Sequence, residues 1–187
     1  ACATCTVSRA SQRGTVQARK GVEMSTCLKW LGIGAAVVAV LLWISGQLGL
    51  FTGTPPSDLG VRDGRLARPS ATPNSVSSQA RLWPDHPQGE YADIAPLALL
   101  RSDGPATIAK LRTLLASEPG ATLIDSRADY LYVQYTTRLL KFVDDVEFWF
   151  DPANEVIQVR SASRIGRSDL GVNRQRIEAL RQRLANS

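Results

Sequence analysis

Hydrophobic and polar residues divide the chain into one long apolar run and a later region of short amphipathic elements. No charged residue lies between Lys29 and Asp58. As a helix, residues 30–51 would span about 33 Å, enough to cross a hydrocarbon core about 30 Å thick. The run therefore predicts a single transmembrane helix at about residues 30–51, within an N-terminal anchor at residues 24–51.

A cleaved signal peptide is the alternative interpretation of this run. The positions that follow its apolar centre, such as Ile44-Ser45-Gly46, offer no clean small-x-small cleavage site, so we favour an uncleaved anchor. The only methionine, Met24, is the first residue of this anchor. We interpret residues 1–23 as an upstream segment, non-native or disordered, that takes no part in the fold.

Residues 52–90 have the composition of a linker. They hold six of the ten prolines, together with Gly, Ser and Thr, and show no apolar periodicity. We expect an extended tether that is partly packed on the domain, near residues 73–79.

Residues 91–187 carry the patterns of one soluble domain. Apolar residues recur at helical spacing around Ile108, after Asp103 as a candidate cap, and again around Leu180. Between them, alternating β-branched and aromatic residues predict two hairpins, 122–126 with 130–136 and 146–150 with 155–161. A further short strand is possible at residues 91–94. The prediction is an α+β fold: a small antiparallel sheet of four or five strands with two helices on one face, preceded by the transmembrane helix.

The charge distribution argues against nucleic acid as a partner. The net charge is +5, but residues 1–73 hold 8 basic and 3 acidic side chains, whereas residues 74–187 hold 14 of each. The basic excess therefore lies outside the folded part. Within that part, residues 160–187 hold seven arginines and two acidic residues, which predicts a local cationic surface.

The domain has little that indicates metal or nucleophile chemistry. Its sequence lacks cysteine, which excludes a disulfide scaffold, thiolate ligands and a cysteine nucleophile. Asp144, Asp145 and Glu147 are acidic, but successive strand residues face opposite sides, so at most Asp145 and Glu147 converge. We favour a solvated or arginine-paired face there, and we expect no metal and no cofactor.

An anion site is the leading hypothesis for the segment in which the last strand leads into the C-terminal helix. Helix N-termini and arginine forks both bind oxyanions. The alternative is structural: Arg160 or Arg164 pairs with Asp144 or Asp145, and Ser168 or Asp169 caps the helix. The candidate ligand-binding residues are Arg160, Ser161, Ser163, Arg164, Arg167, Ser168, Asn173 and Arg174.

Three segments together resemble one family. They are Thr72-Pro73-Asn74-Ser75-Val76-Ser77-Ser78, Phe142-Val143-Asp144-Asp145-Val146-Glu147-Phe148, and Arg160-Ser161-Ala162-Ser163-Arg164 continuing through Gly166, Ser168-Asp169-Leu170-Gly171 and Asn173-Arg174. From about Leu59 to the C-terminus, the chain resembles the domain of unknown function 1499 family of bacterial envelope proteins and plastids. The resemblance implies location and fold more than activity. Many members carry a cysteine after the first asparagine, where this chain has Ser75, so any thiol role in the family is absent here.

The sequence therefore predicts a bacterial inner-membrane protein that crosses the bilayer once and exposes its C-terminal domain to the periplasm. Flanking charges leave the orientation open, and export of the larger part is the commoner arrangement. We expect a non-catalytic module that binds an anionic small molecule, a lipid headgroup or a protein partner. The alternatives are an envelope hydrolase, for which His86 near Ser77 and Ser78 is a weak basis, and a purely structural accessory protein.

Overall fold

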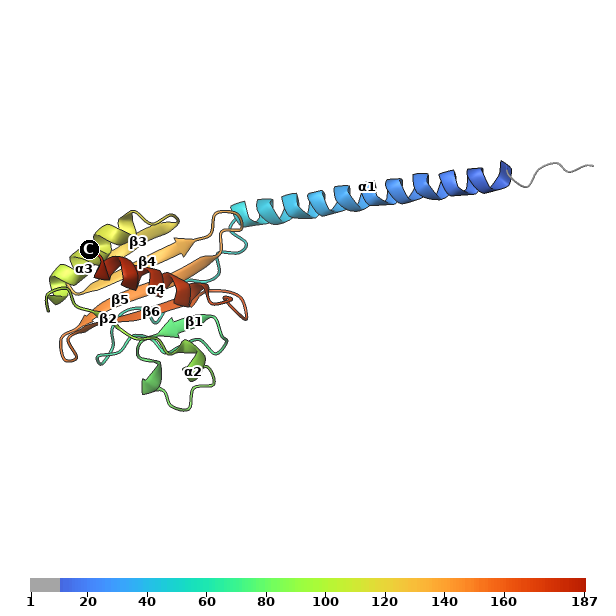
Figure 1. Ribbon diagram of the computed structural model, residues 1–187. Helices are drawn as coiled ribbons and strands as arrows, with labels where there is room; N and C mark the ends of the chain where they lie inside the picture. The colour runs from blue at the N-terminus through green and yellow to red at the C-terminus, as the bar shows by residue number, and fades with distance from the viewer. Residues whose placement is uncertain (1–10) are drawn as a thin grey trace, which may run out of the picture. The chain divides into compact units, whose positions relative to one another are not determined.

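The computed structural model describes the backbone of residues 11–187 and the side chains of residues 26–187. The chain divides into two units, Ala1–Ile44 and Ser45–Ser187 (Figure 1). The interpretation of residues 1–23 as an upstream segment falls on residues whose side chains, and for 1–10 also the backbone, lie outside the described part. It stays a prediction.

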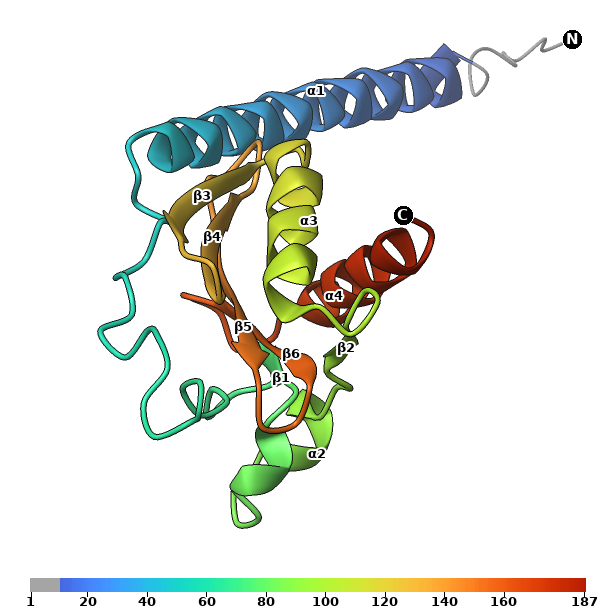
Figure 2. The same ribbon diagram turned by 90° about the vertical axis from the view of Figure 1, so that its left-hand side faces the viewer.

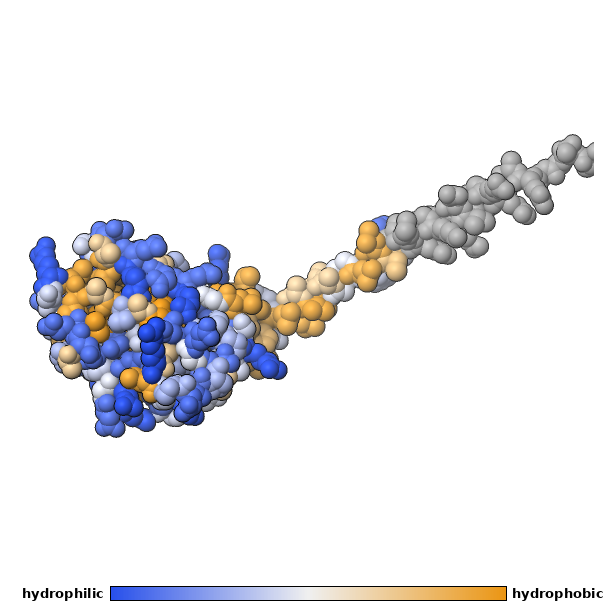
Figure 3. Space-filling model, turned by 60° about the horizontal axis from the view of Figure 1, so that its bottom comes forward, coloured by the Kyte–Doolittle hydropathy of each residue, from blue (hydrophilic) through white to orange (hydrophobic). Residues whose placement is uncertain are grey.

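The N-terminal unit is helical. Helix α1 runs from Ser11 to Gln47, and its part Thr26–Gln47, with a mean hydropathy of 2.1, is long and apolar enough to cross a membrane. Hydrophobic residues follow one another along the described side chains of this helix (Figure 3). A membrane anchor and a signal sequence share these properties. The helix ends earlier than the predicted residue 51, because Gly49 adopts a positive φ of 77° and its N–H turns back to the carbonyl of Gly46.

The C-terminal unit is built on one antiparallel sheet, and the predicted α+β class is confirmed. The strand order is β1-β6-β5-β4-β3, and the two-residue β2 pairs with β6 beside β1. The two predicted hairpins form its centre, and two short strands extend it. The strands are β1 (Ser75–Ser77), β2 (Leu97–Ala98), β3 (Ala121–Ser126), β4 (Tyr130–Thr136), β5 (Val143–Asp151) and β6 (Val156–Ser163).

Helices α3 (Gly104–Ala116) and α4 (Val172–Ala185) cover one face of this sheet (Figure 2). Asp103 precedes α3 as its N-cap, and its side chain accepts a hydrogen bond from the N–H of Ala106 at 2.9 Å. The apolar stripes of both helices meet alternate residues of the strands and form the main core. Its centre includes Ile108, Leu111, Leu115, Val133, Val146, Phe148, Val159, Ile177, Leu180 and Leu184.

The opposite face of the sheet is covered by the segment that the sequence suggests as a linker. Leu66 is buried there with Tyr130 and Tyr132, and its N–H donates to the Gln79 side chain at 2.8 Å. Residues 52–90 therefore belong to the same compact unit as the sheet. The short helix α2 (Gly89–Ala92) takes up residues 91 and 92, where a strand was expected, and Asp93 alone keeps an isolated bridge to Ser77.

Gly120 precedes β3 at a point where two backbones come close. Its φ is +80°, and a Cβ on it would lie 2.7 Å from the carbonyl oxygen of Thr136. Gly120→Ala should lower the free energy of unfolding by about 1–3 kcal/mol, because it combines a strained φ with a backbone clash. Urea titration of the full chain in detergent, followed by circular dichroism, measures this change.

Gly89→Ala is the matched control, since Gly89 has no positive φ and the nearest atom to its Cβ, the Trp83 carbonyl oxygen, is 3.8 Å away. Equal stability of the two variants would contradict the close approach at Gly120.

Candidate functional site

On the face of the sheet away from the helices, side chains of β5 form buried ion pairs with Arg160 of β6 and with Arg164, which follows β6. Arg164 donates to both carboxylate oxygens of Asp145, each at 2.8 Å, and the Tyr132 hydroxyl donates to the same carboxylate at 2.6 Å. The side chains of Arg164 and Asp145 are 5% and 1% exposed. A bidentate pair of this kind uses the guanidinium fork fully, so Arg164 has little capacity left for a ligand.

Glu147 lies on the same face and is completely buried. Burial raises the pKa of its carboxyl, while the Gly60 N–H, Arg160 and the Tyr130 hydroxyl act against this rise. Gly60 and Tyr130 both donate at 2.7 Å, whereas Arg160 lies at 3.5 Å. Gly60, in the segment that covers this face of the sheet, thus supplies one of the hydrogen bonds to the buried Glu147 carboxylate.

On the helix-covered face, Asp144 begins a second polar network. Its carboxylate accepts from Arg176 at 2.5 Å, and Arg176 also donates to the Asn173 side chain at 2.7 Å and to Ser161. Asn173 in turn donates to the Asn74 carbonyl oxygen at 3.0 Å. Asn74, Asp144, Ser161 and Asn173 come from the three sequence segments that carry the family resemblance, and Arg176, which lies just after the third segment, links them into one network.

The remaining predicted ligand-binding residues are placed around this network. Arg174 donates to the backbone carbonyl oxygens of Tyr91 and Asp93, at 2.6 and 2.9 Å. Ser163 accepts from the Asn173 side chain, and Ser168 accepts from the N–H of Leu170. Within the described part of the chain, Arg167 is exposed and makes no hydrogen bond or ion pair.

Asp169 links the N-terminal end of α4 to α2. Its carboxylate accepts from the Tyr91 hydroxyl and from the N–H groups of Gly171 and Asn173. Partial burial by itself raises the pKa of Asp169, but these hydrogen bonds outweigh it and hold the pKa below its usual value. The carboxylate is therefore kept ionised as part of the helix start.

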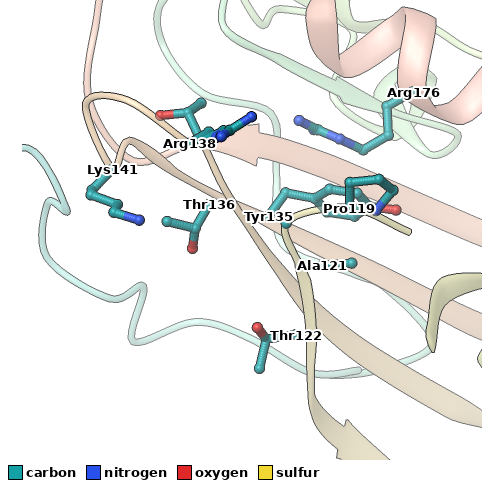
Figure 4. A pocket seen from close by; sticks show the side chains of 10 residues that line it. Pro119, Ala121, Thr122, Tyr135, Thr136, Arg138, Lys141 and Arg176 are labelled. Carbon is teal, nitrogen blue, oxygen red and sulfur yellow. The ribbon is translucent and has the colours of Figure 1, made fainter. Parts of the chain in front are cut away.

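A pocket of about 660 Å³ opens between β3, the end of β4 and α4. Three cationic side chains line it: Arg138 and Lys141 from the β4–β5 loop, and Arg176 from α4. Arg138 and Arg176 turn toward one another across the opening (Figure 4). We call this site, with Tyr135 and the backbone around Gly120, the cationic pocket.

The charges of the cationic pocket are only partly balanced. Asp144 bonds Arg176, whereas Arg138 and Lys141 make no ion pair within the described residues. The Arg176 guanidinium also stacks over the Tyr135 ring, 4.4 Å from its centroid. Burial raises the pKa of Tyr135 to about 12, against the opposing effect of Arg176, so the phenol is neutral at physiological pH.

Sequence reasoning missed this pocket because its residues lie far apart along the chain. Arg138 and Lys141 read as ordinary loop cations, and Arg176 as one of several arginines on a polar helix face. One signal was present: the six-residue loop between β4 and β5 carries two cations, Arg138 and Lys141. Only the folded sheet brings this loop close to Arg176 of α4.

The described residues give no support to the hydrolase alternative. His86 accepts from the N–H of Gln88 through Nδ1, and the Ser78 hydroxyl donates to the Gln158 side chain at 2.6 Å. These two side chains are therefore bonded elsewhere rather than to each other. No group of three or more His, Cys, Asp or Glu side chains within the described part is placed to hold a metal ion.

The family is shown by comparison with known proteins. The model of a protein of unknown function (DUF1499) matches residues 65–184, which is more than half of the chain. The chain belongs to this family, and the resemblance of the three segments is confirmed. No curated protein and no solved structure matches it.

The contrast between Arg164 and Arg167 is testable. Arg164→Met leaves the Asp145 carboxylate buried without its partner and should lower the free energy of unfolding by about 3–5 kcal/mol. Arg167→Met removes an exposed charge and should change it by about 0.5 kcal/mol or less. Urea unfolding of the two variants compares these values directly, and a small effect at Arg164 would show that the pair does not hold the fold.

Proposed function

We propose that this protein is a membrane-anchored, non-catalytic module of the bacterial envelope that binds an oxyanion in the cationic pocket. The observation that carries the proposal is that Arg138, Lys141 and Arg176 line one cavity whose lining residues include no acidic side chain. Of these three cations, only Arg176 has a carboxylate partner among the described residues, Asp144. Like charges that converge without an anion repel each other, and a phosphate or carboxylate group would relieve this repulsion.

The chemistry of the pocket supports an anion over a neutral or cationic ligand. Tyr135 stays protonated at neutral pH and adds no negative charge to the floor. Arg176 is held by Asp144, Asn173 and Ser161, so it is already ordered before a ligand arrives. Pre-ordering of this kind lowers the entropy that binding would otherwise cost.

The predicted ligand-binding segment contributes indirectly to this proposal. Ser161 and Asn173 hold the guanidinium of Arg176, while Arg160 and Arg164 bond to Glu147 and Asp145 on the other face of the sheet. The proposed anion is therefore bound by cations of the β4–β5 loop and α4.

We also propose that the apolar helix remains attached as an inner-membrane anchor, with the domain in the periplasm. The last residues of the span belong to the same compact unit as the domain: Gly46 is buried, and a Cβ on it would lie 2.8 Å from the Leu140 carbonyl oxygen. Gln47 donates to the Leu139 carbonyl oxygen at 3.1 Å. The positions that follow the apolar centre, such as Ile44-Ser45-Gly46, also offer a signal peptidase no clean small-x-small site.

Binding of inorganic phosphate to the full chain in non-ionic detergent tests the proposed function. Phosphate should raise the melting temperature, with a stabilisation of about 2.7 kcal/mol at a hundred times the dissociation constant. The double variant Arg138→Gln with Lys141→Gln should lose most of this effect. Differential scanning fluorimetry at constant ionic strength gives the readout.

The control is Arg112→Gln with Lys110→Gln, which removes the same two charges from α3 outside the pocket. Phosphate also stabilises proteins in general by exclusion from their surface. Specific binding is therefore measured by the difference between the phosphate-induced rises in melting temperature of the two double variants. Equal phosphate responses in both would rule out the cationic pocket as the anion site.

A further inference from the structure

Three largely exposed leucines lie where the apolar helix joins the domain. Leu48, Leu50 and Leu139 are 72%, 68% and 66% exposed. Leu139 belongs to the loop between β4 and β5, and the other two directly follow α1. We call these three residues the leucine rim.

Contacts within the domain unit place this loop against the residues that leave the span. Besides the hydrogen bond from Gln47 to Leu139, Gly46 packs on the backbone of Leu140. The rings of Phe51 and Phe142 lie 5.4 Å apart. Residues 46–51 and 139–142 therefore form one surface.

A bilayer boundary at the end of the span would set the depth of this surface. Gln47 is the last residue of α1 and the last of the apolar window. The headgroup layer on each side of the hydrocarbon core is roughly 5–8 Å deep. Leu139 touches Gln47, and Arg138 is the next residue, with Cα atoms about 3.8 Å apart. Arg138 and Lys141 are thus at the depth of lipid phosphates when the helix spans the membrane.

We propose that the leucine rim seats this end of the domain in the bilayer interface, and that the cationic pocket takes the phosphate headgroup of an anionic phospholipid from the same leaflet. The inference rests on the proposed function and names the source of its anion. Leucines next to cations suit the membrane–water interface. There, apolar side chains insert at the edge of the acyl chains, and Lys or Arg side chains contact lipid phosphates. The leucine rim alone would fit any lipid; the adjoining pocket selects an anionic one.

Hydrogen–deuterium exchange of the full chain in nanodiscs tests this inference. Two lipid compositions are compared: phosphatidylcholine alone, and phosphatidylcholine with phosphatidylglycerol. We expect exchange of the amides in residues 137–142 to be about 25-fold slower with phosphatidylglycerol, since each of the two cations near an anionic surface contributes about fivefold. Arg138→Gln with Lys141→Gln should abolish this difference, and Arg112→Gln with Lys110→Gln should keep it.

Leu139→Ser separates seating from headgroup binding. It should speed up exchange of the loop in both lipid compositions while the rest of the sheet stays protected, which shows that the variant is folded. Equal protection in both compositions for the unaltered chain would overturn the lipid headgroup as the ligand. Fast exchange in both would overturn seating as well.

The phosphate experiment in detergent distinguishes these failures from a failure of the proposed function. A chain that responds to inorganic phosphate, but not to phosphatidylglycerol, binds a free anion and contradicts the inference alone. A chain that responds to neither contradicts both.

Discussion

The consecutive carboxylates Asp144 and Asp145 hold this domain together on both faces of its sheet. Because neighbouring strand residues point to opposite sides, Asp144 bonds Arg176 of α4, and Asp145 bonds Arg164, which follows β6. One dipeptide of β5 thus fixes the start of the C-terminal helix and the loop that leads to it. Unpairing either carboxylate would leave a buried charge, which is far more costly than losing an exposed ion pair.

These pairs explain why an arginine-rich sequence does not give an arginine-rich binding surface. Arg160, Arg164 and Arg174 direct their donors into the protein, to carboxylates or backbone carbonyl oxygens. The cations that remain available lie mainly in loops, such as Arg138 beside the pocket. Local charge counts along a sequence cannot make this distinction, since they carry no information on which carboxylate faces which arginine.

The sequence was sufficient to predict the parts of the fold that repeat over short distances. The alternation from Val146 to Phe150 and the helical spacing around Ile108 and Leu180 specify strands and helices through their own neighbours. Strands as short as β1 and β2 have no such period, because their residues are held by β6 far along the chain. For the same reason, the cover formed by Leu66 and Gly60 looked like a linker: it is polar and proline-rich, and its order comes from Glu147, Tyr130 and Gln79.

The pairing of β1 with β6 has a consequence for how the protein is made. Ser75 lies opposite Ala162, and Asn74 is bonded to Asn173 across 99 positions of the chain. Contacts of such long sequence separation form late in folding. The segment around Asn74 therefore stays unpaired until residues 160–173 have been synthesised. If the domain is exported as we propose, translocation, which threads polypeptides in an extended form, can come before this pairing, because the native topology closes only once α4 is available.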